Sequence, residues 1–316
     1  MRTILVTGGA GFVGSHLCKA LAAKGFSTVA VDDLSNGRRE NLSEDTELLV
    51  EDLSEHGWME SLKHRRLDAV IHCAAQASNA ISFQDPQLDY RANQLATWRV
   101  LQFCQRKGIR RLLFTSSMSV YGEPGRLPTP PSEAPRPLTF YAAHKAAAES
   151  YIRLTPNIDW TIFRLYTTYG MGQNLSNVSQ GLVKIFLGFV LRNQTVKIHG
   201  SGDRVRDIVH VSDVVRAIMQ ALPTPNSYGR CYNIGSGTTL TVSDIIRRIL
   251  SEAGKMPDYP VEYGAPDIGD PHRTHADISA AMRDFGWQPE IMPDAGIKLT
   301  VRQHLEQLRS TGEYKG

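Results

Sequence analysis

Short apolar runs alternate with helical patterns through the first half of the chain. The runs TILVTG, STVAVDD, ELLVED, DAVIHCAA and RRLLFTSS have the length of β-strands, and the first helical pattern begins at about Gly11. Strands that alternate with helices predict a parallel sheet with right-handed crossovers. The continuous apolar character of TILV and AVIH is typical of strands that are buried on both faces.

This alternation loosens beyond Gly170. A strand, WTIFRLYTTYG, is followed by a helix over 182–191, the segments VKIHGSG, RDIVHVSDVVRAIMQAL and YNIGSG, and a helix from Ser243. We therefore predict an α/β fold with a doubly wound parallel sheet over residues 1–166 and a smaller C-terminal α/β region over 167–316. The assignment of segments near 203–235 to one of these two regions stays open, because their strands could return to the first sheet.

Composition narrows the class of partner. The 35 basic and 32 acidic residues are interspersed, the formal net charge is +3, and basic residues cluster only in pairs such as Arg38-Arg39 and Arg110-Arg111. No basic stripe interleaved with aromatic residues is present, so we expect no nucleic-acid partner. The four cysteines are scattered without CxxC spacing, which indicates neither a disulfide framework nor a bound metal.

The N-terminal sequence and the apolar runs bear on location. MRTILVTGGAG becomes glycine-rich before a signal-peptide core could form, and no apolar run reaches transmembrane length. We therefore expect a cytoplasmic protein with no membrane partner.

A glycine array follows the first strand. In TILVTGGAGFVGSH, Gly8 permits a tight turn, Gly11 lets the backbone approach a pyrophosphate and Gly14 allows close packing of helix on strand. The next helix would present unpaired NH groups and a positive dipole end to the phosphates. Asp32, at the end of the second strand, stands where an acid hydrogen-bonds the adenosine ribose, which favours NAD over NADP. The pattern predicts a Rossmann dinucleotide site for NAD.

A tyrosine and a lysine are spaced by about one helical turn in YAAHK. Because residues i and i+4 share a helix face, Tyr141 and Lys145 point into the same space. A nearby cation stabilises phenolate and lowers the pKa of the tyrosine towards the range where it can accept a proton. The pair follows a dinucleotide loop and a strand that ends in the serines of FTSSMSVYG, which favours a catalytic pair over an ordinary solvated one.

Together these motifs resemble those of the extended short-chain dehydrogenase/reductases, in the family of NAD-dependent nucleotide-sugar epimerases and dehydratases. The similarity runs through TGGAGFVGSH, DDLSNG, HCAAQ, FTSSMSVYG, YAAHK, RDIVHVSDVV, YNIGSG and ADISAAMRDFGWQP, and so covers nearly the whole chain. Within the family, the chain looks most like the UDP-sugar 4-epimerases.

The resemblance implies roles for individual residues. Ser117 matches the catalytic serine or threonine, Tyr141 the base, and Lys145 the residue that binds the nicotinamide ribose and lowers the pKa of the tyrosine. The cofactor positions that the family implies are Gly8, Gly11, Phe12, Val13, Gly14, Asp32, Asn36, Asp52, Leu53, Ala74, Asn93, Tyr141 and Lys145.

Other polar residues near these motifs have no implied catalytic role. The hydroxyls of Thr115, Ser116 and Ser119 match no catalytic position, so we interpret them as structural. For His72 and His144 we expect packing roles rather than acid/base chemistry.

The resemblance implies that Ser117 and Tyr141 also contact the substrate. The other implied substrate contacts lie in the second region. Arg206, in GDRVRDIVHVSDVV, matches an arginine that clamps the nucleotide diphosphate. An ion pair with Asp207 or Asp213 is the structural alternative.

Two positions depart from the family pattern. Thr167 stands where the family often has an asparagine that meets the diphosphate, and Asp267 stands where a second phosphate arginine is usual. An aspartate there would repel a diphosphate. The nearby His272 or Arg273 could supply the missing charge.

The residues after Ser117 indicate the reaction. Dehydratases of this family carry an Asp-Glu pair there, whereas this chain has Met118 and Ser119, neither of which acts as a general acid or base near neutral pH. We therefore predict a nucleotide-sugar 4-epimerase with a UDP-linked substrate. In it the Tyr141 phenolate removes a hydroxyl proton while hydride passes from C4 to NAD, and the hydride then returns to the opposite face of the sugar.

Alternative functions remain open. A related dehydratase, decarboxylase or 4-ketoreductase would use another acid, for which Asp267 is a candidate. A non-catalytic NAD-sensing protein on the same fold is the alternative from another class. The resemblance also implies a homodimer, formed by the helix around 92–105 and the helix that starts at Tyr141.

Overall fold

The computed structural model describes residues 2–175, 177, 180–256 and 258–310. A sheet of seven strands, ordered β11-β6-β5-β4-β1-β2-β3, forms its centre. The strands are β1 (Thr3–Thr7), β2 (Ser27–Asp32), β3 (Glu47–Val50), β4 (Ala69–His72), β5 (Arg111–Ser117), β6 (Asp159–Leu165) and β11 (Arg230–Ile234). All neighbouring strands are parallel, and the strand order reverses direction between β1 and β4. The predicted doubly wound sheet is confirmed.

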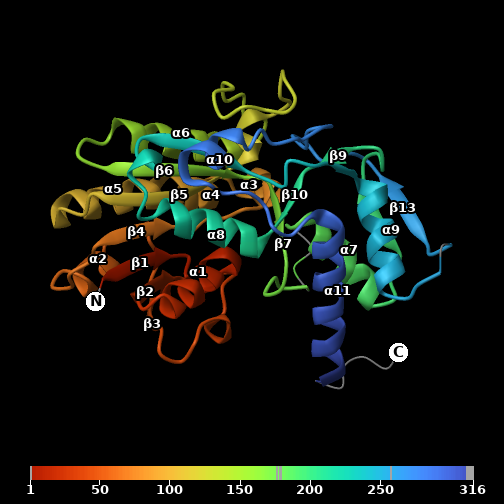
Figure 1. Cartoon of the computed structure of the whole chain (residues 1–316), viewed down its shortest axis with the longest axis horizontal. Helices are drawn as coiled ribbons and strands as arrows, with labels where there is room; N and C mark the ends of the chain where they lie inside the picture. Colours follow the sequence, from red (N-terminus) through yellow and green to blue (C-terminus); the bar gives the residue numbers. More distant parts are fainter. Residues whose placement is uncertain (1, 176, 178–179, 257, 311–316) are drawn as a thin grey trace.

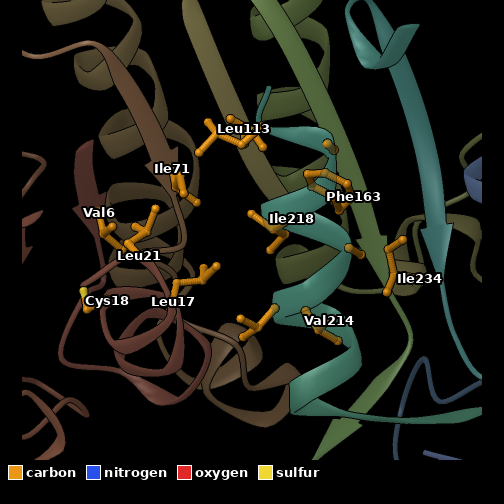
Figure 2. Packing of buried hydrophobic residues seen from close by; sticks show 14 of the residues in the cluster. Val6, Leu17, Cys18, Leu21, Ile71, Leu113, Phe163, Val214, Ile218 and Ile234 are labelled. Atoms are coloured by element: carbon orange, nitrogen blue, oxygen red, sulfur yellow. The ribbon is translucent and has the colours of Figure 1, made fainter. Parts of the chain in front are cut away.

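Helices cover both faces of this sheet (Figure 1). One face carries α1 (Phe12–Ala23), α8 (Val211–Ala221) and α10 (Ser279–Phe285), and the other carries α2 (Gly57–Ser61), α5 (Ala96–Lys107) and α6 (Phe140–Leu154). Figure 2 shows how Leu17 of α1 and Ile218 of α8 meet strand residues such as Ile71 in one apolar cluster. Trp58 and Val100 belong to the cluster on the opposite face. The strands are apolar on both sides because both sides are covered.

The helix expected over 92–105 begins irregularly. Residues Tyr90–Leu95 form a π-helix, η2, and regular α-helix starts only at Ala96. Two short helices, α3 (Asn79–Gln84) and α4 (Pro86–Asp89), precede it. Short 3-10 turns occur at η1 (Arg39–Asn41), η3 (Met118–Tyr121) and η4 (Pro225–Ser227).

A second region with its own apolar core lies beside the sheet. Its elements are β7 (Thr167–Tyr169), α7 (Leu182–Leu191), β8 (Val196–His199), β9 (Val205–Arg206), β10 (Ile208–His210), β12 (Leu240–Thr241), α9 (Val242–Glu252), β13 (Val261–Gly264) and α11 (Pro293–Ser310). Three two-stranded sheets, β10-β7, β12-β9 and β13-β8, connect these elements. Phe186, Ile198 and Ile249 are among the residues of the core that α7, β8 and α9 share.

The chain returns to the central sheet after entering this second region. β11 pairs in parallel with β6, and α8 packs beside α1. Part of the segment that the sequence left open therefore completes the first sheet. The division at residue 166 stays a prediction, and we propose that α8 and β11 be counted with the cofactor-binding part of the chain.

Candidate active site

A large cleft of about 1780 Å³ lies between the central sheet and the second region. Its lining includes residues at the carboxyl ends of β1, β2, β4 and β5, where ligands of doubly wound sheets bind. The residues expected at the site that line it are Gly8, Gly11, Phe12, Val13, Gly14, Asp32, Asn36, Asp52, Leu53, Ala74, Ser117, Tyr141, Lys145, Thr167, Arg206 and Asp267. The fold thus brings together the glycine turn, the hydroxyl strand and the second region.

The glycine turn leaves backbone open where a phosphate would approach. Gly8 has φ +65°, and a Cβ placed on it would lie 2.6 Å from the backbone nitrogen of Ala74. A Cβ on Gly14 would collide with the carbonyl oxygen of Gly8. Within the described chain, no side chain caps α1 at Gly11, so the first NH groups of this helix remain available to an anion. The turn fits the pyrophosphate of a dinucleotide.

Asp32 lies at the end of β2 on the wall of the cleft. Its Oδ2 accepts a hydrogen bond from the Ala10 backbone NH (3.0 Å), and its Oδ1 accepts one from Leu34 (2.9 Å). Burial raises the pKa of this carboxyl, and these backbone NH groups oppose the rise. Each oxygen can accept a further bond, so the carboxylate fits the ribose hydroxyls of NAD.

Two further residues expected to contact the cofactor, Asn36 and Asp52, already have hydrogen-bond or ion-pair partners in the protein. The Asn36 Oδ1 accepts from the Asn177 side chain (3.1 Å), which links the cofactor loop to the segment before α7. Asp52 accepts from the Ser54 backbone NH (2.7 Å) and forms an ion pair with Arg91 (3.2 Å). Both residues still line the cleft.

Asn93 does not line the cleft. It is buried, and its Nδ2 donates to the Gln76 carbonyl oxygen (2.9 Å) and to Asp89 (3.0 Å). Its Oδ1 has no partner among the described residues. The cofactor contact expected of Asn93 stays a prediction.

Ser117 and Tyr141 both line the cleft and contact each other. Ser117 ends β5, accepts from the Ser119 backbone NH (3.1 Å) and donates to the Ser119 Oγ (3.1 Å). Tyr141 is on α6, which begins after Thr139, whose hydroxyl accepts from the Ala142 NH (3.1 Å). Burial raises the pKa of Tyr141 to about 12, and a hydrogen bond with Ser117 opposes this rise.

Lys145 is buried one turn further along α6. Its Nζ donates to the Thr115 carbonyl oxygen (2.9 Å) and lies 4.5 Å from the centre of the Phe114 ring. Burial lowers the pKa of Lys145 to about 8. Burial of the phenol dominates the pKa of Tyr141, so the lowering that we expected from this cation stays a prediction.

The neighbouring hydroxyls and histidines serve the framework. Ser116 donates to Glu149 (2.6 Å), and Thr115 donates to the His72 carbonyl oxygen (3.3 Å). The His72 ring lies within hydrogen-bond distance of the hydroxyls of Thr7 and Thr97, and it is fully buried. His144 contacts Asp89 through Nδ1 (2.6 Å) beside the Tyr90 and Phe140 rings. These contacts agree with the packing roles that we expected.

On the substrate side, Arg206 is buried but faces the cleft. Its Nη2 forms an ion pair with Asp270 (2.7 Å), and its Nη1 donates to the carbonyl oxygens of Val205 and His272. The alternative prediction, an ion pair of Arg206 with Asp207 or Asp213, is wrong, because both carboxylates accept hydrogen bonds from backbone NH groups elsewhere. Asp270 also pairs with Arg204.

The two residues that depart from the family pattern, Thr167 and Asp267, line the cleft as Arg206 does. Thr167 begins β7. Asp267 pairs with His199 (2.8 Å), and the side chains of Asp267 and His199 are 61% and 60% exposed. His272 and Arg273, expected as sources of positive charge, are not among the lining residues.

Comparison with known proteins decides the family. The model of the NAD dependent epimerase/dehydratase family matches residues 4–235. This chain belongs to that family. It is 36% identical over 310 residues to the UDP-glucose 4-epimerase of Mycolicibacterium smegmatis, covering 95% of this chain and 97% of the relative.

Solved structures agree with this membership of the NAD dependent epimerase/dehydratase family. The fold is similar to that of the Thermotoga maritima UDP-glucose 4-epimerase with UDP-glucose, with a TM-score of 0.92, 34% identity and coverage of 97% and 100% of the two chains. It is also similar to the Thermus thermophilus UDP-glucose 4-epimerase in complex with NAD, with a TM-score of 0.88, 34% identity and coverage of 95% and 98%. The predicted family, the NAD cofactor and the prediction of an enzyme are confirmed, and these relatives are 4-epimerases, as we predicted for this chain.

For a member of this family, sequence reasoning missed two cleft residues. Asp270 was missed because only the fold brings it to Arg206. Lys184 was missed although it is the only charged residue in the apolar helix LVKIFLGFVL, a pattern that can indicate a buried charge. Among the described helices, none combines the length and apolar character that a membrane crossing requires.

Proposed function

We propose that this protein is an NAD-dependent nucleotide-sugar 4-epimerase that acts on a UDP-linked sugar. The observation that carries the proposal is that Ser117 and Tyr141 line the same cleft as the glycine turn. The residue after Ser117 is Met118 rather than an acid. The UDP-sugar 4-epimerases similar to this chain support the substrate class.

The chain's own groups would act as follows. Tyr141 takes the proton of the sugar hydroxyl, and the Ser117 hydroxyl holds that oxygen and can pass the proton. Lys145 would bind the nicotinamide ribose, and Arg206 would offer paired donors to the diphosphate. The chemistry that bound NAD would supply is reversible hydride transfer with C4 of the sugar.

The reaction test uses the purified protein with UDP-glucose, UDP-N-acetylglucosamine or their uronate forms. Proton NMR should show the C4 epimer of one of these sugars at unchanged product mass, with no net NADH. Loss of water or of carbon dioxide from the product mass would instead indicate a dehydratase or a decarboxylase. Steady consumption of added NADH would indicate a 4-ketoreductase.

We also propose that the protein is a homodimer that pairs α5 and α6. Large apolar side chains on these helices remain exposed, including Trp98, Phe140 and Leu154. Light scattering should give twice the chain mass, and Trp98→Asp should shift it towards the monomer. A cytoplasmic location is part of the proposal, and the four free cysteines support it.

A further inference from the structure

Lys184 is a charged side chain in an apolar helix. α7 reads LVKIFLGFVL, and Val183, Phe186 and Leu187 of this helix belong to the core of the second region. Lys184 is itself only 4% exposed, yet it lines the cleft together with Arg206. The helix therefore presents one buried cation to the cavity.

Among the described residues, no carboxylate pairs with the Lys184 ammonium. Its Nζ donates to the backbone carbonyl oxygen of Asn177, and within the described part of the chain it forms no ion pair with a carboxylate. Burial alone lowers the pKa of Lys184 to about 8. A buried ammonium without a counter-charge is costly, and an anion that enters the cleft would offset that cost.

Carboxylates near Arg206 reduce the positive charge that the second region offers to a diphosphate. Arg206 shares Asp270 with the buried Arg204, so its charge is partly neutralised before any ligand binds. Asp267 adds a further negative charge to the lining. Among the described residues of the second region that line the cleft, the lysine and arginine side chains are those of Lys184 and Arg206, and neither His272 nor Arg273 lines it. Lys184 is therefore the cation that this region can add to Arg206 for a diphosphate.

We propose that Lys184 binds the diphosphate of the nucleotide-sugar substrate as the second cation beside Arg206, replacing the arginine that the family pattern expects where this chain has Asp267. The proposal rests on the proposed function, because it assumes a substrate that carries a diphosphate. It assigns Lys184 to the substrate rather than to NAD, because the NH groups at the start of α1 already fit the cofactor's phosphates.

The test measures binding of UDP, UMP, uridine and UDP-glucuronate to the NAD-loaded protein by calorimetry. Lys184→Met keeps the length of the side chain and removes its charge, and we expect it to weaken UDP about tenfold or more while leaving uridine unchanged. Lys197→Met is the matched control, since Lys197 is exposed on β8 and does not line the cleft. It should leave UDP binding unchanged. If Lys184→Met does not fold, Lys184→Gln replaces it.

A second variant tests the exchange of positions. Asp267→Arg restores the expected arginine, and in the Lys184→Met background it should recover most of the lost UDP affinity. Equal UDP affinity for wild type and Lys184→Met would overturn the inference and leave the proposed function standing. Weakening of UDP-glucuronate alone would assign Lys184 to a sugar carboxylate, and weakening of NAD alone would assign it to the cofactor; either result overturns the inference. A wild-type protein that binds no UDP would contradict both proposals.

Discussion

Lys145 directs its ammonium to the backbone carbonyl of Thr115, 2.9 Å away, on the strand that carries Ser117. The bond ties α6 to β5 beside the proposed reaction centre. It also holds a cation in a fully buried position, where burial lowers the pKa of Lys145 to about 8 from an ordinary value of 10.5. A residue proposed to act on the cofactor is therefore also a source of pH-dependent stability.

The first prediction concerns Lys145→Met and the free energy of unfolding. Because the folded-state pKa lies below that of the unfolded chain, the unfolded chain keeps this proton to higher pH. The wild-type protein should therefore gain stability from this group between about pH 8 and 10.5. Lys145→Met lacks this gain, so the stability of the variant relative to wild type should fall by at most about 3 kcal/mol over that range.

Urea unfolding at pH 7, 8, 9 and 10 measures this difference. Lys197→Met, which removes an exposed charge, should run parallel to wild type across the series. A constant difference between Lys145→Met and wild type from pH 7 to 10 would contradict the role of burial.

The second prediction concerns Tyr141→Phe. Loss of the phenol removes the proposed base, so kcat for epimerisation should fall by about 10²- to 10⁴-fold. NAD binding should change little, because the ring remains. Tyr151→Phe is the matched control on the same helix: it removes a hydroxyl that binds Gln94 (2.6 Å), outside the cleft, and should keep nearly full activity. Activity above a tenth of wild type in Tyr141→Phe would exclude it as the base.

The third prediction separates two neighbouring hydroxyls. Ser117→Ala should lower kcat by about 10²-fold, because the Ser117 hydroxyl is proposed to hold the reacting oxygen. Ser119→Ala removes only the acceptor of the Ser117 hydroxyl (3.1 Å) and should cost less than about tenfold. If both substitutions have the same effect, the two serines act as one hydrogen-bonded unit and the assignment to Ser117 alone is wrong.

The sequence was sufficient for those parts of the site that are local in the chain. The glycine turn, Asp32 at the end of a strand and the spacing of Tyr141 and Lys145 depend on neighbours within a few residues. The partner of Arg206 could not be predicted, because Asp270 is 64 residues away and reaches it only through the folded second region. The direction of the Tyr141 pKa shift depends on burial, which spacing along a helix does not reveal.

The last prediction tests the turn that joins β1 to α1. A Cβ on Gly14 would meet the carbonyl oxygen of Gly8, a backbone atom that can move only if the helix shifts away from the strand. Gly14→Ala should therefore weaken NAD by at least about tenfold, since the helix N-terminus holds the phosphates through its position. Gly11→Ala, whose Cβ would lie 3.1 Å from the same oxygen, should have an intermediate effect.

The control for this series is Gly264→Ala on β13. Its Cβ would meet only the carbonyl oxygen of Ile198, at an ordinary contact distance of 3.7 Å, far from the cofactor wall. Calorimetric titration with NAD at a temperature where all variants are folded separates loss of affinity from loss of stability. Gly14→Ala with the NAD affinity of Gly264→Ala would mean that close packing of α1 on β1 is not what positions the phosphates.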